Sequence, residues 1–142
     1  MRVFSRKSVK NNICGLTNPI EWEYNSDMKR TFFEMKHFTR KWIELGFSDE
    51  DLRNLQNMLV ENPKAGPVMQ GTGGLRKIRF AFPNTGKSGS VRVCYIDIED
   101  VLEIHLIDVF AKNEKDNLSK AERNQIKVVV EKIKQERLKR AR

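Results

Sequence analysis

The chain has 142 residues, of which 39% are hydrophobic, and a formal net charge of +8. This composition suits one domain with a modest core, and the excess positive charge favours an anionic partner such as nucleic acid or an acidic protein. No apolar run is long enough to span a membrane, and the first residues lack the apolar stretch of a secretory signal, so we expect a cytoplasmic protein. Two distant cysteines, Cys14 and Cys94, predict neither a disulfide framework nor a metal site.

The first 27 residues show no clear hydrophobic periodicity and contain several turn-forming residues, so we expect an irregular arm over 1–27. A strand is expected just after Met28, where Thr31, Phe32, Phe33 and Met35 follow. Met28 is itself a candidate for the start of translation, and the mass of the natively expressed protein would test that hypothesis.

Two short helices are expected next. The first has apolar residues at helical spacing: Phe38, Trp42 and Leu45. Thr39 can act as its N-cap, and Gly46 is well placed to end it. The second begins with the capping-box pattern Ser48-Asp-Glu-Asp and has one apolar face: Leu52, Leu55, Met58 and Leu59. Together they predict a helical hairpin that covers one face of a sheet.

The sheet itself is expected after a connection rich in glycine and proline, with strands over 75–82, 91–98 and 102–110. The links between these strands are short, which favours antiparallel neighbours. On the first strand one face is apolar: Ile78, Phe80 and Phe82. The other face carries Leu75, Lys77, Arg79 and Ala81.

A last helix is expected from the capping-box pattern Ser119-Lys-Ala-Glu, with packing residues Ile126, Val129, Val130 and Ile133. Its end is strongly basic, because residues 132–142 hold six cations and a single carboxylate, Glu136. Cations in a last helical turn are favoured by the helix dipole, so we expect 135–142 to form a solvated, frayed basic tail.

The first two strands and their loop carry the most informative pattern, a set of cations without a carboxylate before Asp97: Arg76, Lys77, Arg79, Lys87 and Arg92. These charges repel one another unless an anion lies among them. Lys77 and Arg79 are expected roughly 7 Å apart on one strand face, close to the spacing of successive phosphates. Two interpretations stand side by side: a phosphate-binding site, or a solvated basic strand edge.

Other chemistries fit the sequence poorly. The carboxylates and histidine of the strand region are scattered over both faces, so we expect no metal site and no cofactor. His37 and His105 are interpreted as residues at a helix start and on the sheet surface, and Cys94 as a core filler. Gly71 to Gly74 form a turn and not a phosphate loop, because no Lys-Ser/Thr opens a helix after them.

The remaining possibility is metal-free cleavage of RNA, in which the 2′-hydroxyl attacks the adjacent phosphate. Such an enzyme must remove one proton, stabilise the charge on phosphorus and protonate the leaving oxygen. Lys77 is a candidate base, because the charges of Arg79 and Arg92 favour its neutral amine. The arginines stay charged and suit bidentate phosphate contacts.

Five segments, in order, resemble the RelE/HigB branch of the RelE/ParE superfamily of bacterial toxin–antitoxin systems. They are Asn62-Pro-Lys-Ala-Gly, Gly71-Thr-Gly-Gly-Leu-Arg-Lys-Ile-Arg-Phe-Ala, Gly86-Lys-Ser-Gly, Arg92-Val-Cys-Tyr and Phe110-Ala-Lys-Asn-Glu. The resemblance covers residues 28–134, the expected toxin domain. It implies an α+β RelE-like fold: an N-terminal strand and helical hairpin packed on an antiparallel sheet, and a C-terminal helix.

The resemblance also implies a function. Members of this branch are ribosome-dependent mRNA endoribonucleases that act in the 30S A site and inhibit translation. A cognate antitoxin silences them, and operator DNA is bound only through that antitoxin. By position, the residues that match catalytic groups are Lys77, Arg79, Arg92 and Lys112. Those expected to position RNA are Arg76 and Lys87.

Two departures from the family pattern are clear. Phe110 stands where the family usually has tyrosine, which predicts reduced activity, and Ser90 replaces a common glycine. The lack of a strong conventional base suggests that ribosomal RNA helps to arrange the substrate. Two alternatives remain: a toxin of the same fold that inhibits DNA gyrase, and a non-enzymatic module that only binds an antitoxin.

Overall fold

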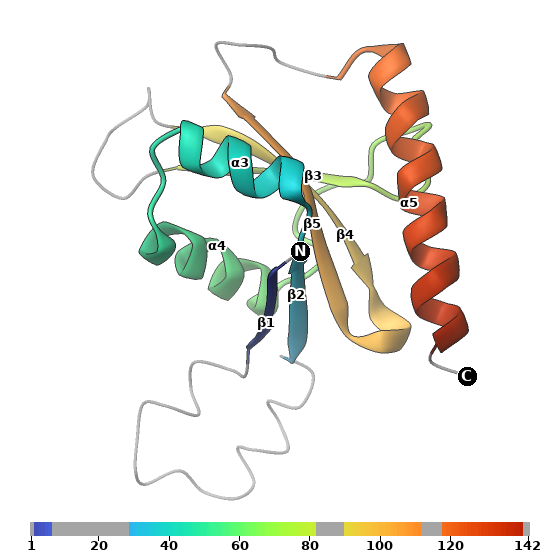
Figure 1. The fold of residues 1–142 in the computed structure, drawn as a ribbon, viewed down its shortest axis with the longest axis horizontal. Helices are drawn as coiled ribbons and strands as arrows, with labels where there is room; N and C mark the ends of the chain where they lie inside the picture. Colours follow the sequence, from blue (N-terminus) through green and yellow to red (C-terminus); the bar gives the residue numbers. More distant parts are fainter. Residues whose placement is uncertain (1, 7–28, 82–89, 112–117, 141–142) are drawn as a thin grey trace, which may run out of the picture.

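The computed structural model describes residues 2–6, 29–81, 90–111 and 118–140 (Figure 1). Within them the elements are β1 (Arg2–Arg6), β2 (Arg30–Glu34), α3 (Lys36–Glu44), α4 (Asp49–Glu61), β3 (Arg76–Phe80), β4 (Val91–Ile98), a 3-10 turn η3 (Glu99–Val101), β5 (Glu103–Ala111) and α5 (Lys120–Arg140). Helices α3 and α4 cover one face of the sheet and α5 covers the other (Figure 1). The expected α+β class, with a helical hairpin and a C-terminal helix, is confirmed.

The described strands form one mixed sheet in the order β1-β2-β5-β4-β3. Neighbours are antiparallel except for β2 and β5, which are parallel, with Thr31 opposite Glu103. The antiparallel pairing expected for the three strands after the helices is confirmed, and β2 adds a parallel pair with β5 that the sequence did not indicate. The chain between β2 and β5 contains two helices and two strands, which is long enough for the crossover that parallel neighbours require.

The strand β1 is a second difference from the sequence-based expectation. Arg2–Arg6 pairs antiparallel with β2 and forms the edge of the sheet. The irregular arm expected over 1–27 is thus wrong for residues 2–6, and residues 7–28 lie outside the described ranges. The hypothesis that Met28 starts translation stays a prediction.

Local signals located the helices, with one correction. The capping box of α4 is present: Ser48 Oγ accepts from the Asp51 amide at 3.2 Å, and an Asp51 carboxylate oxygen accepts from the Ser48 amide at 2.9 Å. Thr39, however, is not the N-cap of α3, because the helix already begins at Lys36 after Met35. The Thr39 hydroxyl donates instead to Glu34 Oε1 at 2.9 Å, which ties α3 to the end of β2.

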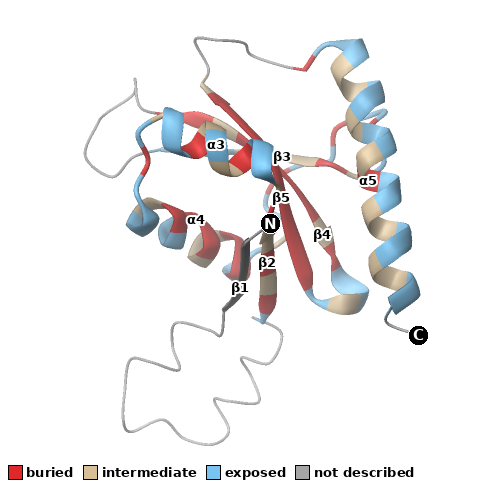
Figure 2. Cartoon of the chain, in the orientation of Figure 1, coloured by how far each residue is buried: buried red, intermediate tan, exposed pale blue. Residues whose placement is uncertain are grey.

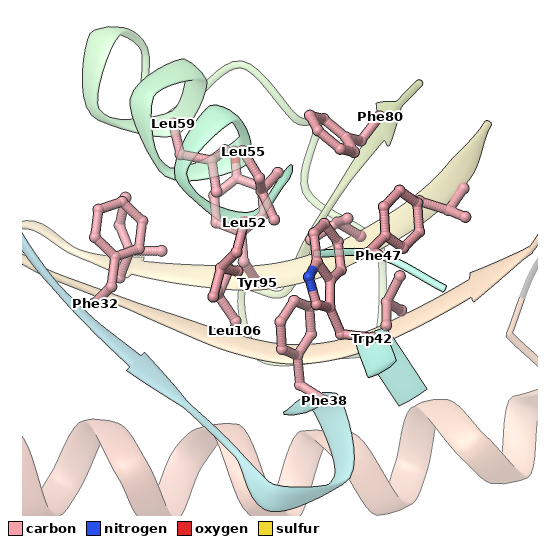
Figure 3. Packing of buried hydrophobic residues seen from close by; sticks show 14 of the residues in the cluster. Phe32, Phe38, Trp42, Phe47, Leu52, Leu55, Leu59, Phe80, Tyr95 and Leu106 are labelled. Carbon is pink, nitrogen blue, oxygen red and sulfur yellow. The ribbon is translucent and has the colours of Figure 1, made fainter. Parts of the chain in front are cut away.

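The main core lies between the sheet and the pair α3 and α4 (Figure 3). Its centre is aromatic: the Trp42 ring stacks on Phe38 and Phe47, with centroid distances of 5.5 and 4.1 Å, and also contacts Phe80 of β3. The Trp42 indole N–H donates to the Ser48 carbonyl at 3.2 Å, so its polar edge is satisfied. These contacts fix the position of β3 against the helices.

A second, smaller core lies on the opposite face, under α5. Its fully buried residues are Leu75, Cys94, Ile96, Phe110 and Val130. Figure 2 shows β4 and β5 buried along most of their length, whereas α5 is largely exposed or half-buried. The interpretation of Cys94 as a core filler is confirmed, since its side chain is fully buried in this core.

The helix α5 is held at its C-terminal half by polar contacts. Arg137 donates to both carboxylate oxygens of Glu103, at 2.9 and 2.7 Å, and its guanidinium lies 4.8 Å from the Phe33 ring centroid. The Phe33 ring also stacks on His105, with a centroid distance of 4.6 Å, and His105 hydrogen-bonds Glu103 at 3.0 Å. The frayed tail expected over 135–142 is therefore wrong up to Arg140, where α5 ends.

The loop that leads into β3 is held by one buried hydroxyl. Tyr95 is fully buried on β4, and its hydroxyl donates to the Pro63 carbonyl at 2.8 Å and accepts from the Gly66 amide at 3.0 Å. Gly66 lies so close to β3 that a Cβ atom there would be 2.8 Å from the Lys77 carbonyl oxygen. The hydroxyl and the missing side chain together set the distance between this loop and β3.

Replacing Tyr95 with Phe should lower the free energy of unfolding by about 1–3 kcal/mol, because a buried donor and a buried acceptor lose their partner while the ring still packs. Urea denaturation would measure the change, with the slope against denaturant unchanged. A variant as stable as the wild type would show that the loop does not depend on this hydroxyl.

The Glu103 cluster should make stability depend on pH. Burial raises the Glu103 pKa, but the hydrogen bonds and charge of Arg137, with the hydrogen bond of His105, outweigh burial and bring the pKa below its ordinary value. Burial also lowers the His105 pKa, so the folded state favours the neutral imidazole. Both groups bind protons more readily in the unfolded chain, so stability should fall as the pH drops below about 6.5 and further through the titration of Glu103.

Glu103→Gln should remove the lower part of this acid dependence in denaturation experiments run from pH 7 to pH 3. The matched control is Glu99→Gln, since the Glu99–Lys64 pair is an exposed ion pair and is screened by solvent. An equal effect of both substitutions would contradict the role given to the Glu103 cluster.

Candidate active site

A glycine-rich turn positions β3. Gly71, Gly73 and Gly74 all have positive φ angles, of 75°, 76° and 113°, which side chains of L-residues rarely adopt. The buried Thr72 hydroxyl donates to the Met69 carbonyl at 2.6 Å and accepts from the Leu75 amide at 3.1 Å, which closes the turn. The segment is a turn, as expected, and it delivers the chain to Arg76 in a fixed register.

The register of the sheet brings three of the predicted cations to one face. Arg79 lies opposite Arg92, and Arg92 lies opposite Phe110 on β5. One row further along, Lys77 lies opposite Cys94. Because directly opposed residues share a face, and alternate residues of a strand do too, the side chains of Lys77, Arg79 and Arg92 emerge on the α5 side of the sheet.

The electrostatics of this face are unfavourable without a ligand. Two arginines directly opposed on neighbouring strands repel each other. Arg79 is exposed, whereas Arg92 is half-buried, and among the described residues its Nη1 atom is buried without a hydrogen-bond partner. A guanidinium nitrogen that has lost water and gained no acceptor favours an anion nearby. The pair therefore has the properties of an oxyanion-binding site.

Arg76 is not brought to this face. It alternates with Lys77, so its side chain emerges on the opposite face, where Nη1 donates to the Gly66 carbonyl at 2.8 Å and approaches the Lys64 carbonyl at 3.4 Å. Arg76 thus holds the loop before β3, and its expected role in positioning RNA finds no geometric support here. Lys87 and Lys112, the other two predicted site residues, lie outside the described residues.

Phe110 and Ser90 are the two residues that depart from the RelE/HigB sequence pattern that the chain otherwise resembles. Phe110 is completely buried in the second core, so an apolar ring suits its surroundings. It lies directly opposite Arg92 on the neighbouring strand, so its apolar ring and the Arg92 side chain emerge on the same face of the sheet. Ser90 is buried immediately before β4 and requires no positive φ angle, since Leu102 is the one non-glycine residue with positive φ in the described ranges.

The sequence did not reveal a histidine–carboxylate hydrogen bond that the structure shows at β5. His37, in the first turn of α3, makes a 2.9 Å hydrogen bond from Nε2 to Asp108 Oδ1 on β5. The two residues are 71 positions apart, so no local pattern could have linked them. They line a groove of about 310 Å³ between β5 and α5, together with Met35, Ile107, Glu122, Gln125, Ile126 and Val129.

The described residues include both histidines of the chain, His37 and His105. None of their histidine, cysteine and carboxylate side chains gather in a group of three that could hold a metal ion. His105 is buried and hydrogen-bonds Glu103 at 3.0 Å, so the sheet-surface position expected for it is wrong. Within the same ranges, no helix combines the length and apolarity needed to cross a membrane.

No protein-family model matches the chain. It is similar in structure to a doubly substituted mutant of the Escherichia coli toxin RelE in the free state, with 19% identity, a TM-score of 0.45, and coverage of 60% of this chain and 85% of that one. It is also similar to the intact E. coli RelBE toxin–antitoxin complex, with 20% identity, a TM-score of 0.44, and coverage of 56% and 93%.

Proposed function

We propose that this protein is the toxin of a type II toxin–antitoxin system and that it cleaves mRNA on the ribosome as a metal-independent endoribonuclease. The observation that carries the proposal is the opposition of Arg79 and Arg92 across β3 and β4, with Lys77 on the same face. The motif resemblance around Gly71 to Arg92 points to the same activity.

The proposed chemistry follows from the charge arrangement. A 2′-hydroxyl attacks the adjacent phosphorus, and negative charge grows on the non-bridging oxygens. Arg79 and Arg92 approach from neighbouring strands and can each offer paired N–H groups to those oxygens. Because the sheet holds both strands before substrate arrives, little reorganisation is needed when the charge develops.

The proposed partners follow from the same surface. A ribonucleotide chain is one anionic ligand for these cations, and an acidic segment of a cognate antitoxin is the other. Either would relieve the repulsion between Arg79 and Arg92. An antitoxin that covers this face would exclude mRNA by occupying the same positive charges, and any operator DNA would then be bound through the antitoxin. The protein would act in the cytoplasm, where ribosomes are.

Arg92→Gln should abolish growth arrest on expression without antitoxin and lower the cleavage rate on ribosomes by about 10²–10³-fold, as expected for loss of one transition-state donor. Mapping RNA 5′ ends after a short pulse of expression would measure cleavage. The matched control is Arg53→Gln, because Arg53 is an exposed cation on α4, across the sheet from the proposed site.

Circular dichroism would check that both variants fold. Intact transcripts in cells arrested by the wild type would contradict the proposal. If those cells showed DNA damage signalling and their messages were unbroken, inhibition of DNA gyrase would replace it.

Arg79→Gln should weaken binding of an unstructured RNA oligonucleotide and reduce the slope of log affinity against log salt concentration by about 0.7, the value for one phosphate contact on a single strand. Arg76→Gln should leave the slope unchanged, because the Arg76 guanidinium is bound to the Gly66 carbonyl on the other face. Titration at several salt concentrations would measure both. Equal slopes for Arg79→Gln and the wild type would remove Arg79 from the RNA-binding surface.

A further inference from the structure

The His37–Asp108 pair lies next to the proposed phosphate site. In the ladder between β4 and β5, Phe110 is opposite Arg92 and Asp108 is opposite Cys94. Asp108 and Arg92 are therefore diagonal neighbours on the same face of the sheet, with a separation of about 7–8 Å. An arginine side chain and an imidazole hydrogen-bonded to Asp108 can both reach one ribose-phosphate unit over such a distance.

The His37–Asp108 pair has the arrangement that a histidine general base requires. Asp108 has a side chain only 11% exposed, and its Oδ1 atom also accepts from the Val109 amide at 2.8 Å, so the carboxylate is held in place. The His37 side chain is 50% exposed and open to a ligand. A buried carboxylate that orients a solvent-facing imidazole is the arrangement that supports proton transfer by histidine.

The hydrogen bonds also define which ring nitrogen is free. An ionised carboxylate can only accept, so Nε2 of His37 carries the hydrogen toward Asp108. Nδ1 then holds the lone pair. This agrees with the position of Arg40 Nη2, a donor that lies 3.4 Å from Nδ1. Nδ1 is therefore the atom that can take up a proton, once the exposed Arg40 side chain moves off it.

Charged groups of both signs surround the imidazole. Asp108 on β5 is hydrogen-bonded to Nε2, and Glu122 of α5 lines the same groove. Arg40, one turn along α3, lies on the Nδ1 side.

We propose that His37 is the general base of this reaction and that Asp108 is its positioning residue; this assignment rests on the proposed ribonuclease function. Nδ1 of His37 takes the proton of the 2′-hydroxyl as O2′ forms a bond to phosphorus. The P–O5′ bond breaks, and its electron pair stays on O5′, which takes a proton from water or the Lys77 ammonium. The products are a 2′,3′-cyclic phosphate and a 5′-hydroxyl, and the imidazolium then returns its proton to solvent.

This assignment gives the role of base to His37 in place of Lys77, the candidate that the sequence suggested. Arginine cannot act as a base near neutral pH, and a base-catalysed step needs a group that changes its charge there. With the 2′-hydroxyl proton taken up by His37, Lys77 can contact the phosphate or protonate the leaving oxygen.

The test is single-turnover cleavage by the full chain, from pH 5 to pH 9, of mRNA on programmed ribosomes and of free RNA. His37→Gln keeps an amide donor toward Asp108 but cannot take up a proton, so its rate should fall by about 10²–10⁴-fold with RNA affinity unchanged. The fall in rate that the wild type shows at acidic pH should disappear in this variant. Glu44→Gln, an exposed change at the far end of α3, is the matched control and should cleave as the wild type does.

Three further variants separate a base from a structural residue. Asp108→Asn should slow cleavage less than His37→Gln does, and the double variant should be no slower than His37→Gln alone, because Asp108 acts through the imidazole. Added imidazole should restore part of the cleavage by His37→Ala and none of the cleavage by Arg92→Gln.

The outcomes are distinct. If wild-type protein cuts neither RNA, the proposed function fails, and the assignment of His37 fails with it. If the wild type cuts RNA while His37→Gln cuts it equally well with the same pH profile, only the assignment fails. Weakened RNA binding with no rescue by imidazole would make His37 a binding residue and would also overturn the assignment.

Discussion

The arrangement of the molecule depends on the β3–β4 ladder, which holds two arginines against each other. The opposition of Arg79 and Arg92 is destabilising in isolation, yet the register leaves the chain no alternative. A slip of one residue would turn Ile78 and Phe80 out of the main core. Burial of the apolar face therefore keeps Arg79 and Arg92 opposed on the other face. A bound phosphate would relieve the repulsion between them.

The two cores hold the β3–β4 ladder from opposite faces of the sheet. The aromatic cluster around Trp42 holds β3 and its loop from the α3 side, and Tyr95 fixes the loop through Pro63 and Gly66. The smaller core under α5 buries Phe110, which lies opposite Arg92. The Glu103–Arg137 pair adds a polar contact between α5 and the sheet to the packing of Val130 in the second core.

Features set by nearby residues could be predicted from the sequence. The capping boxes at Ser48 and Ser119, the turn at Gly71 to Gly74 and the alternation in β3 are short-range patterns, and each is present in the structure. The shared face of Lys77 and Arg79 follows from the same alternation. Thr39 was misassigned because a capping residue and a residue in the first turn of a helix look alike in sequence.

Features that depend on distant partners could not be predicted in this way. The parallel pairing of β2 with β5 joins strands with most of the domain between them, and the strand at Arg2–Arg6 has no local pattern strong enough to identify it. The His37–Asp108 pair and the loss of Arg76 to the Gly66 carbonyl likewise required the packed structure. The number of cations can be read from the sequence, whereas the contacts that each cation makes depend on the packed structure.

The parallel pairing of β2 and β5 has a consequence for biosynthesis. β5 is the central strand between β2 and β4, and it leaves the ribosome after every other described strand of the sheet. Until then β2 has no neighbour on its inner side, and the ladder that seats Phe110 beside Arg92 cannot close. A nascent chain therefore completes the sheet around Arg79 and Arg92 only after β5 has been synthesised.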